Sequence, residues 1–152
     1  MSSNYFALFE IEPAFNIGID QLEKKYIELS RTDINEGQSK NIMNINKAYQ
    51  VLKSPLKRAE HLLDFFDVKS QNDHPNSETL NESIEIREYL LDCDDLQFAS
   101  RMIDKRIKEC IKNLTNAFAK KKNNEAAKQV LRLKYLYKSF EEVKKNAANS
   151  NF

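Results

Sequence analysis

Few side chains in this sequence are of a type and spacing that could carry out catalysis or bind a metal ion. Its two histidines and two cysteines form no cluster with one another. A catalytic site needs a nucleophile beside a base, a pair of carboxylates in a cleft or a metal centre, and none of these can be identified here. Cys93 and Cys110 are too few and too far apart for a zinc site or a disulfide framework, and Cys110 falls on an apolar face as a small core residue would. We therefore expect no catalytic residue, no metal and no cofactor.

One stretch combines apolar and acidic side chains in a pattern that could bind another protein. Its apolar residues are Leu80, Ile84, Ile86, Leu90 and Leu91, with Glu85, Glu88 and Asp92 beside them. A helix with more apolar surface than one buried stripe either lies deep in a core or offers a face to a partner. Composition alone favours the core.

Lysine clusters raise the alternative of nucleic-acid binding. Lys120-Lys121-Lys122 lies at the expected end of a helix, where cations complement the helix dipole, and this explains the cluster adequately. Acidic residues balance the other lysines, and the formal net charge is +1. We therefore expect neither a nucleic acid nor a membrane surface as a partner.

The composition predicts an all-helical protein. The 152 residues suit one domain or two small units, and they include only two glycines and three prolines, whereas 31% are charged. No basic-then-apolar leader is present, and no apolar run approaches the ~20 residues of a bilayer span. We expect a soluble, cytoplasmic protein.

The chain is organised around residues 45–66, where two helices meet at a serine–proline pair. Ser54 supplies an N-cap hydroxyl, and Pro55 occupies the first helical position, where its missing N–H costs nothing. Apolar residues recur three and four apart on both sides of the pair: Ile45, Ala48, Tyr49 and Leu52, then Leu56, Ala59, Leu62, Leu63 and Phe66. This pattern by itself predicts only a helical hairpin or kink.

The N-terminal residues predict two further helical elements. Residues 4–11 form a short helical turn whose aromatic side chains pack inward: Tyr5, Phe6 and Phe9. After a break at residues 13–18, Asp20 and Glu23 form a capping box that begins a helix ending near Arg31. Its expected buried residues are Leu22, Tyr26 and Leu29, and its expected outward residues are Lys24, Lys25 and Glu28.

The C-terminal half predicts three helices after the polar stretch 67–78. Two helices follow the stretch that includes Ile84, and residues 120–124 form the turn between them. Their apolar stripes are Ile103, Ile107, Cys110, Ile111, Leu114 and Phe118, then Ala126, Ala127, Val130, Leu133, Tyr137 and Phe140. Short turns between long helices predict antiparallel neighbours, and the residues from Asn146 onward have no stripe and are expected to fray.

The residues around the serine–proline pair closely resemble the HscB family of J-type co-chaperones, which act in iron–sulfur cluster assembly. The matching segments are Asn46-Lys47-Ala48-Tyr49, Leu52-Lys53 and the run SPLKRAEHLL at residues 54–63. The resemblance extends over roughly residues 4–145, although a glycine usually stands where Glu10 is here. It implies an all-α, L-shaped protein with a J-like domain packed at an angle on a three-helix bundle. The expected ranges are 1–67 for the J-like domain, 68–76 for the linker, 77–146 for the bundle and 147–152 for the tail.

The resemblance also implies a scaffold-binding site. In HscB proteins the first helix of the bundle binds the scaffold protein IscU, which favours a surface position for the stretch around Ile84. The matching positions are Leu80, Ile84, Glu85, Glu88 and Asp92, with Tyr135 from the third helix of the bundle. Asn81 stands where a larger apolar contact is common, and Asp92 is shorter than the usual glutamate.

The chain departs from the J-domain pattern at the contact with the ATPase chaperone. J domains carry basic residues on the second helix, which makes Lys24, Lys25 and Arg31 the candidates here. Their next loop holds a His-Pro-Asp tripeptide that is required for stimulating ATP hydrolysis. Residues 30–37 read SRTDINEG, so only Asp33 is left as a candidate, and His74-Pro75 lies in the expected linker.

Taken together, the resemblance implies a co-chaperone that binds an IscU-type scaffold and delivers it to a DnaK-class, HscA-type ATPase chaperone. The missing tripeptide leaves open an alternative, a degenerate J-like adaptor that binds a client or chaperone without activating the ATPase. A third alternative is an unrelated helical bundle.

Overall fold

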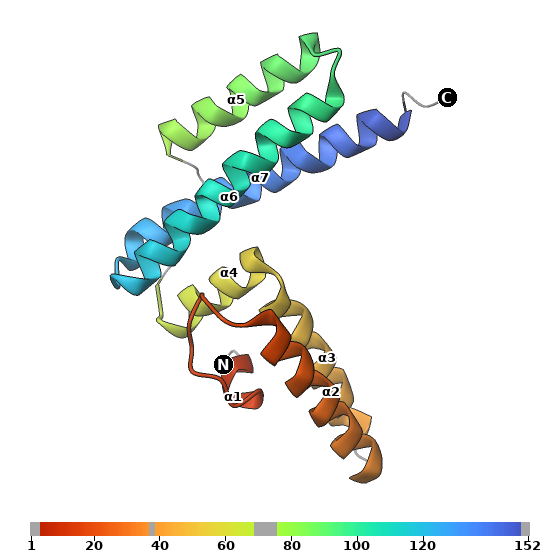
Figure 1. Ribbon diagram of the computed structural model, residues 1–152. Helices are drawn as coiled ribbons and strands as arrows, with labels where there is room; N and C mark the ends of the chain where they lie inside the picture. The colour runs from red at the N-terminus through yellow and green to blue at the C-terminus, as the bar shows by residue number, and fades with distance from the viewer. Residues whose placement is uncertain (1–3, 37–38, 69–75, 150–152) are drawn as a thin grey trace. The chain divides into compact units, whose positions relative to one another are not determined.

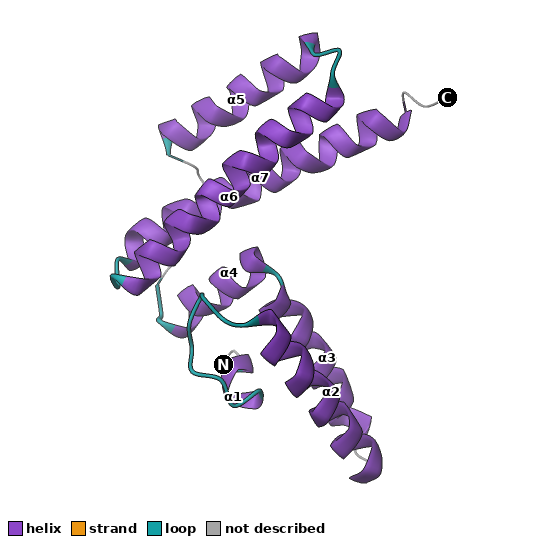
Figure 2. Ribbon diagram, viewed as in Figure 1, coloured by secondary structure: helices purple, strands orange, loops and turns teal. Residues whose placement is uncertain are grey.

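The computed structural model describes residues 4–36, 39–68 and 76–149 (Figures 1 and 2). Every regular element in these ranges is an α-helix, which confirms the all-α prediction. The helices are α1 (Tyr5–Leu8), α2 (Ile19–Glu36), α3 (Ser39–Lys53), α4 (Pro55–Phe65), α5 (Ser77–Asp92), α6 (Leu96–Ala119) and α7 (Asn123–Asn149). The chain divides into two compact units, Met1–Lys69 and Ser70–Phe152, and each has its own core.

The first unit is built on the predicted junction between α3 and α4. The hydroxyl of Ser54 accepts a hydrogen bond from the backbone N–H of Lys57 at 3.3 Å, and Pro55 opens α4, as predicted. The stripes of the two helices are buried at Ile45, Ala48, Leu52, Ala59, Leu62 and Leu63. Tyr49 is half-buried and stacks on Tyr26 of α2, with ring centroids 4.2 Å apart.

A buried arginine closes the corner between α3 and α4. Arg58 is only 7% exposed, and its guanidinium donates to the carbonyl of Leu52 at 2.8 Å. The same guanidinium lies 4.8 Å from the centre of the Phe15 ring. Because the last carbonyls of a helix have no partner within the helix, this contact stabilises the C-terminus of α3.

The aromatic N-terminal turn is helical, as predicted, and it contacts α3 and the His61 ring of α4. Phe6 and Phe9 are buried, and the ring of His61 stacks on Tyr5 and Phe6 at 4.7 and 5.5 Å. Nε2 of His61 accepts a hydrogen bond from the backbone N–H of Tyr5 at 3.1 Å. Only a neutral imidazole can accept this bond, so it is the neutral form of His61 that fixes α1. Burial lowers the pKa of His61, although the nearby Asp64 opposes this effect.

Helix α2 differs from the prediction at both ends. It begins at Ile19, and the carbonyl of Gly18 accepts from the N–H of Leu22 at 3.0 Å. Asp20 therefore lies inside the first turn, and the predicted Asp20–Glu23 capping box is wrong. The helix also continues past Arg31 to Glu36, because no glycine or proline interrupts the backbone before Gly37.

The second unit is an antiparallel pair, α6 and α7, with α5 lying along it (Figure 1). Its buried residues include Ile103, Ile107, Cys110 and Leu114 of α6 and Ala126, Val130, Leu133 and Leu136 of α7. The turn between α6 and α7 is shorter than predicted, because Asn123 already opens α7 and Lys121 takes a left-handed φ of 58°. Helix α7 also continues to Asn149, three residues beyond the predicted end of the bundle at residue 146. Residues 150–152 and the pair His74-Pro75 lie outside the described residues.

Candidate functional site

Helix α5 turns its apolar stripe toward solvent. Leu80 and Ile84 are each 47% exposed and Leu91 is 81% exposed, whereas Ile86 is buried against the rest of the unit. The core position favoured by composition alone is therefore wrong for this stripe. Leu80, Ile84 and Leu91 are therefore accessible to a partner, which an apolar stripe at the surface commonly indicates.

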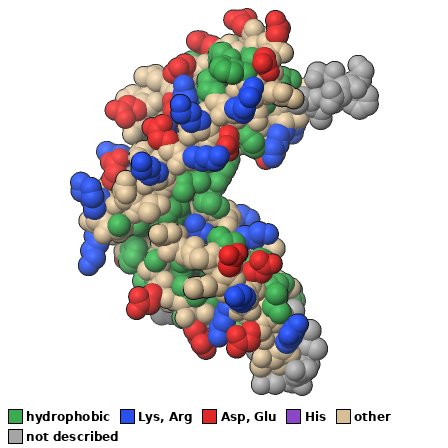
Figure 3. Space-filling view, in the orientation of Figure 1, with side chains coloured by type: hydrophobic (Ala, Val, Ile, Leu, Met, Phe, Trp, Pro, Cys, Tyr) green, Lys and Arg blue, Asp and Glu red, His purple; other side chains and the backbone are tan. Residues whose placement is uncertain are grey.

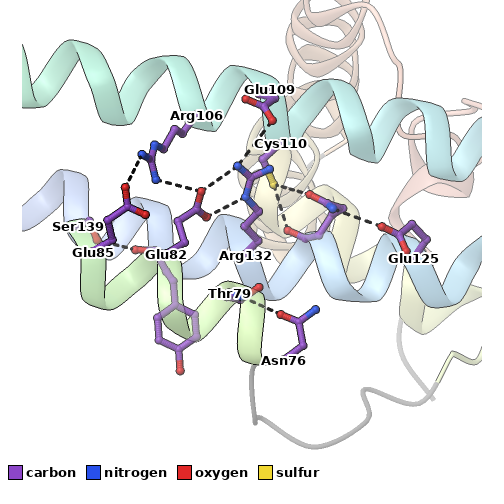
Figure 4. Close-up of polar contacts among 12 residues, drawn as sticks. Asn76, Thr79, Glu82, Glu85, Arg106, Glu109, Cys110, Glu125, Arg132 and Ser139 are labelled. Carbon is purple, nitrogen blue, oxygen red and sulfur yellow. Dashed lines mark hydrogen bonds and ion pairs between the residues drawn. The ribbon is translucent and has the colours of Figure 1, made fainter. Parts of the chain in front are cut away.

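An ion-pair network decides which face of α5 points inward. Both carboxylate oxygens of Glu82 accept from Arg132 of α7, at 2.9 and 3.0 Å, and Arg106 of α6 donates to Glu82 at 3.3 Å (Figure 4). Burial raises the pKa of Glu82, but the hydrogen bonds and charges of Arg132 and Arg106 outweigh it and hold the pKa below its usual value. Glu82 therefore stays ionised and fixes α5 on both neighbouring helices.

The acidic residues of α5 follow the helix beside its exposed apolar stripe. Glu85, Glu88 and Asp92 recur at three- and four-residue spacing, and all three are exposed. Glu85 also accepts from Arg106 at 3.4 Å, so it lies at the edge of the ion-pair network (Figure 4). An apolar stripe and a line of carboxylates thus share the outer surface of one helix, as the predicted site requires.

Tyr135, the predicted contribution of α7 to the site, is half-buried. Its ring lies 5.5 Å from the ammonium of Lys138, and its carbonyl accepts from the hydroxyl of Ser139. Helix α7 is the neighbour that packs along α5. The structure therefore brings the six predicted scaffold-binding residues onto two adjacent helices of one unit.

The predicted chaperone-binding residues all lie on α2, but they differ in how far they are exposed. Lys24 and Arg31 are exposed. Lys25 is half-buried, so the prediction that it faces outward is wrong, and it pairs with Glu10 at 3.1 Å and with Glu28 at 4.0 Å. Asp33 lies in the last turns of α2 rather than in a loop, because residues 30–36 are helical.

Sequence reasoning missed the network that positions α5. Glu82, Arg106 and Arg132 come from three helices, and 50 residues separate Glu82 from Arg132. Nothing in the local spacing of these residues marks them as partners. The only available signal is their position on the otherwise apolar inner faces of their helices.

The buried thiol of Cys110 matches its predicted role as a core residue. It is fully buried, and its Sγ lies 3.2 Å from the carbonyl oxygen of Gln129. Burial raises the pKa of Cys110 to about 12, so the thiol stays protonated and unreactive. Within the described ranges, no group of three or more His, Cys, Asp or Glu residues is placed to hold a metal ion. In the same ranges, no helix has the length and apolar character needed to cross a bilayer.

Comparison with known proteins assigns the chain to a class and then to a family. Residues 75–144 match the family model described as the HSCB C-terminal oligomerisation domain. A co-chaperone protein HscB homolog from Pseudoalteromonas atlantica is 33% identical, and the match covers 98% of this chain and 99% of that protein. A second HscB homolog, from Neisseria meningitidis, is 30% identical over 93% of this chain and 97% of its own length.

Solved structures agree with these sequence relatives. The chaperone HscB from Vibrio cholerae has a TM-score of 0.81 at 26% identity, and the match covers 97% of this chain and 99% of that one. Human co-chaperone HscB shares the fold, with a TM-score of 0.84 over 96% of this chain and 83% of its own. The class is thus that of an all-helical co-chaperone. The chain belongs to the HscB family, which supports a role in iron–sulfur cluster biogenesis alongside a chaperone partner.

Proposed function

We propose that the second unit binds an IscU-type scaffold protein through the outer face of α5, and that the first unit brings this complex to an HscA-type ATPase chaperone. The supporting observation is the exposure of Leu80 and Ile84 at 47% each beside exposed Glu85 and Glu88. Buried apolar area supplies affinity in such an interface, and the surrounding charges choose orientation and partner. In this proposal the protein itself neither binds the iron–sulfur cluster nor hydrolyses ATP, and it acts in the cytoplasm.

Substitution of one exposed apolar side chain tests the scaffold site. We expect Ile84→Gln to raise the dissociation constant for a purified IscU-type scaffold about tenfold, since burying a large aliphatic side chain contributes about 1.5–3 kcal/mol. Met43→Gln is the matched control, because Met43 is a 75% exposed apolar residue of α3 in the other unit. Titration calorimetry measures both. Equal affinities for the two variants would contradict the site.

Tyr135 should contribute to the same surface. The double variant Ile84→Ala, Tyr135→Ala is expected to bind the scaffold more weakly than either single variant while keeping the helical circular dichroism of the wild type. Loss of the helical signal would instead identify these side chains as part of the core.

A second candidate function is that of an adaptor that binds its client without activating the ATPase. The helical state of residues 30–36 favours it, because J domains present their His-Pro-Asp tripeptide in a loop at this point, whereas residues 30–36 of this chain are helical and do not contain the tripeptide. Exposed Lys24 and Arg31 would still provide an electrostatic contact with an acidic chaperone surface, which mainly sets encounter rate and orientation.

Chaperone ATP turnover separates the two candidates. The rate is measured with the scaffold present, with and without this protein, in parallel with scaffold binding. An increased rate that falls on Lys24→Ala, Arg31→Ala substitution supports delivery with stimulation. A flat rate beside measurable scaffold binding supports the adaptor.

A further inference from the structure

Opposite charges are divided between the first two helices of the second unit. Residues 76–95 include seven acidic residues and one basic residue, whereas residues 96–122 include eight basic and two acidic residues. In the space-filling view, Asp and Glu side chains gather over α5, and Lys and Arg side chains gather beside them over α6 (Figure 3). One face of the unit therefore carries both signs of charge, in two separate bands.

Each of the two helices arranges its exposed charges as a strip. The acidic strip of α5 consists of Glu78, Glu85, Glu88 and Asp92. The basic strip of α6 consists of Arg101, Lys105, Lys108 and Lys112. All eight side chains are exposed, and at 3.6 residues per turn each strip stays within about 80° around its helix. We call the two strips together the charged face.

Two of these charges form ion pairs within the unit. Glu85 pairs with Arg106 at 3.4 Å, and Lys108 pairs with Asp104 at 3.1 Å. Exposed ion pairs of this kind contribute about 0.2–1 kcal/mol, so these side chains can exchange partners at an interface.

The acidic and basic residues lie at matching levels along the two helices. Only residues 93–95 join α5 to α6, so the helices are antiparallel (Figure 1). The ion pair between Glu85 and Arg106 fixes which residues lie side by side. Counting in opposite directions from it places three acid–base combinations level to within two residues: Glu88 with Arg101, Glu85 with Lys105, and Glu78 with Lys112.

An aromatic pair lies between the two strips, where α5 ends and α6 begins. Tyr89 is 37% exposed and Phe98 is 51% exposed, and their ring centroids lie 6.3 Å apart. Around their helices, Tyr89 lies about 40° from Glu85 and Phe98 about 60° from Arg101. The rings therefore add an exposed apolar contact to one end of the charged face.

This pattern of charge selects the kind of partner. A partner with one sign of charge would be attracted by one strip and repelled by the other. Nucleic acids and anionic membranes are partners of that kind. A surface that carries an acidic and a basic strip side by side is complementary, and the charged face of a second copy is such a surface.

Two-fold symmetry brings the opposite strips together. Rotation by 180° about an axis that runs parallel to α5 and α6, between them, exchanges the sides of the two strips and keeps their levels. The acidic strip of each copy then faces the basic strip of the other copy, and the pairs of Tyr89 and Phe98 meet at one end. Such an interface is isologous, so it closes as a dimer and does not extend into a filament.

We propose that the second unit binds a second copy of this chain through the charged face, as a two-fold dimer, and that this dimer covers the carboxylates of the proposed scaffold site. Glu85, Glu88 and Asp92 belong to both surfaces, so they cannot contact the scaffold and a second copy at once. The covering of the scaffold site rests on the proposed function. It regulates that site, because self-association and scaffold binding exclude each other.

A charge exchange between the strips tests the dimer. The two variants are Arg101→Glu, Lys105→Glu, which makes both strips acidic, and Glu85→Lys, Glu88→Lys, which makes both basic. In sedimentation of the full chain at low ionic strength, we expect the wild type to self-associate and each variant to do so about tenfold more weakly, because like charges now face each other. An equimolar mixture of the two variants is expected to associate again, since every strip then meets its opposite.

The control variant makes the same change of charge elsewhere in the unit. Lys138→Glu, Lys145→Glu alters two exposed lysines of α7 and should leave self-association unchanged. Circular dichroism checks that each variant keeps its helices. A wild type that stays monomeric at its highest soluble concentration overturns the dimer. So does a mixture that stays monomeric, or a control variant that associates as weakly as the strip variants.

Competition with the scaffold tests the second part of the proposal. Addition of a purified IscU-type scaffold is expected to dissociate the wild-type dimer into complexes that contain one copy of this chain. A scaffold that binds the intact dimer overturns the covering of the site and leaves the dimer standing. A scaffold that does not bind the wild type at all overturns the proposed function and the covering, whereas the charge exchange still decides the dimer.

Discussion

Glu10 adopts a left-handed backbone conformation, with φ of 57°, directly after the turn that closes α1. Residues with a Cβ atom are strained by about 1–2 kcal/mol there, and glycine is not. This geometry is one that glycine, the residue that the family resemblance leads us to expect at this position, adopts without strain. Here the glutamate side chain reaches Lys25 at 3.1 Å, and this exposed ion pair offsets only a small part of the strain.

A pair of substitutions at Glu10 isolates the backbone effect. Glu10→Gly and Glu10→Ala both remove the ion pair with Lys25, but only glycine relieves the left-handed strain. We expect Glu10→Gly to be more stable than Glu10→Ala by about 1 kcal/mol in urea unfolding of the full chain. Equal stabilities, or a more stable alanine variant, would show that the strain is absent.

At the scale of the helix, α5 is held by charge as much as by apolar contact. Only Thr79 and Ile86 of its residues are buried, and Glu82 accepts hydrogen bonds from Arg106 of α6 and Arg132 of α7. A helix anchored in this way keeps its apolar stripe at the surface without loss of order. This division of roles allows α5 to be both a stable element and an interaction surface.

Removal of the Glu82 charge should loosen α5 selectively. We expect Glu82→Gln to reduce the free energy of opening α5 by about 2 kcal/mol, which speeds amide exchange in α5 about 30-fold, because two arginines lose a charged acceptor. Glu85→Gln is the matched control, since Glu85 is 70% exposed and makes one longer ion pair, and it should change the opening free energy by less than about 0.5 kcal/mol. Similar exchange rates in the two variants would contradict the anchoring role of Glu82.

The same contact should depend on pH. The pKa of Glu82 is lower in the folded chain than in the unfolded one, so its contribution is complete above the unfolded value of 4.5 and is lost as the pH falls through the folded value. The difference between wild type and Glu82→Gln should therefore shrink in acid.

At the scale of the whole molecule, local chemistry predicted most helices but not how their faces are used. The Ser54–Pro55 junction and the stripes of α6 and α7 were readable because caps and 3.6-residue periodicity act within a few residues. The C-terminal ends of α2 and α7 could not be predicted in this way. Where no glycine or proline ends a helix, its last residue depends on tertiary packing. The outward turn of Ile84 depends on the pairing of Glu82 with Arg132, which no local pattern encodes. Composition alone favoured a core position for α5, and resemblance to the family instead made this helix the candidate site.

The account depends most on direct contact between the outer face of α5 and the scaffold. A photoreactive amino acid placed at position 84 in the full chain, mixed with a purified IscU-type scaffold, is expected to crosslink to it on irradiation. The same probe at Lys112, an exposed position of α6 in the same unit, is expected to give little product. Absence of a crosslink from position 84, or equal yields from the two positions, would contradict the claim that α5 holds the scaffold.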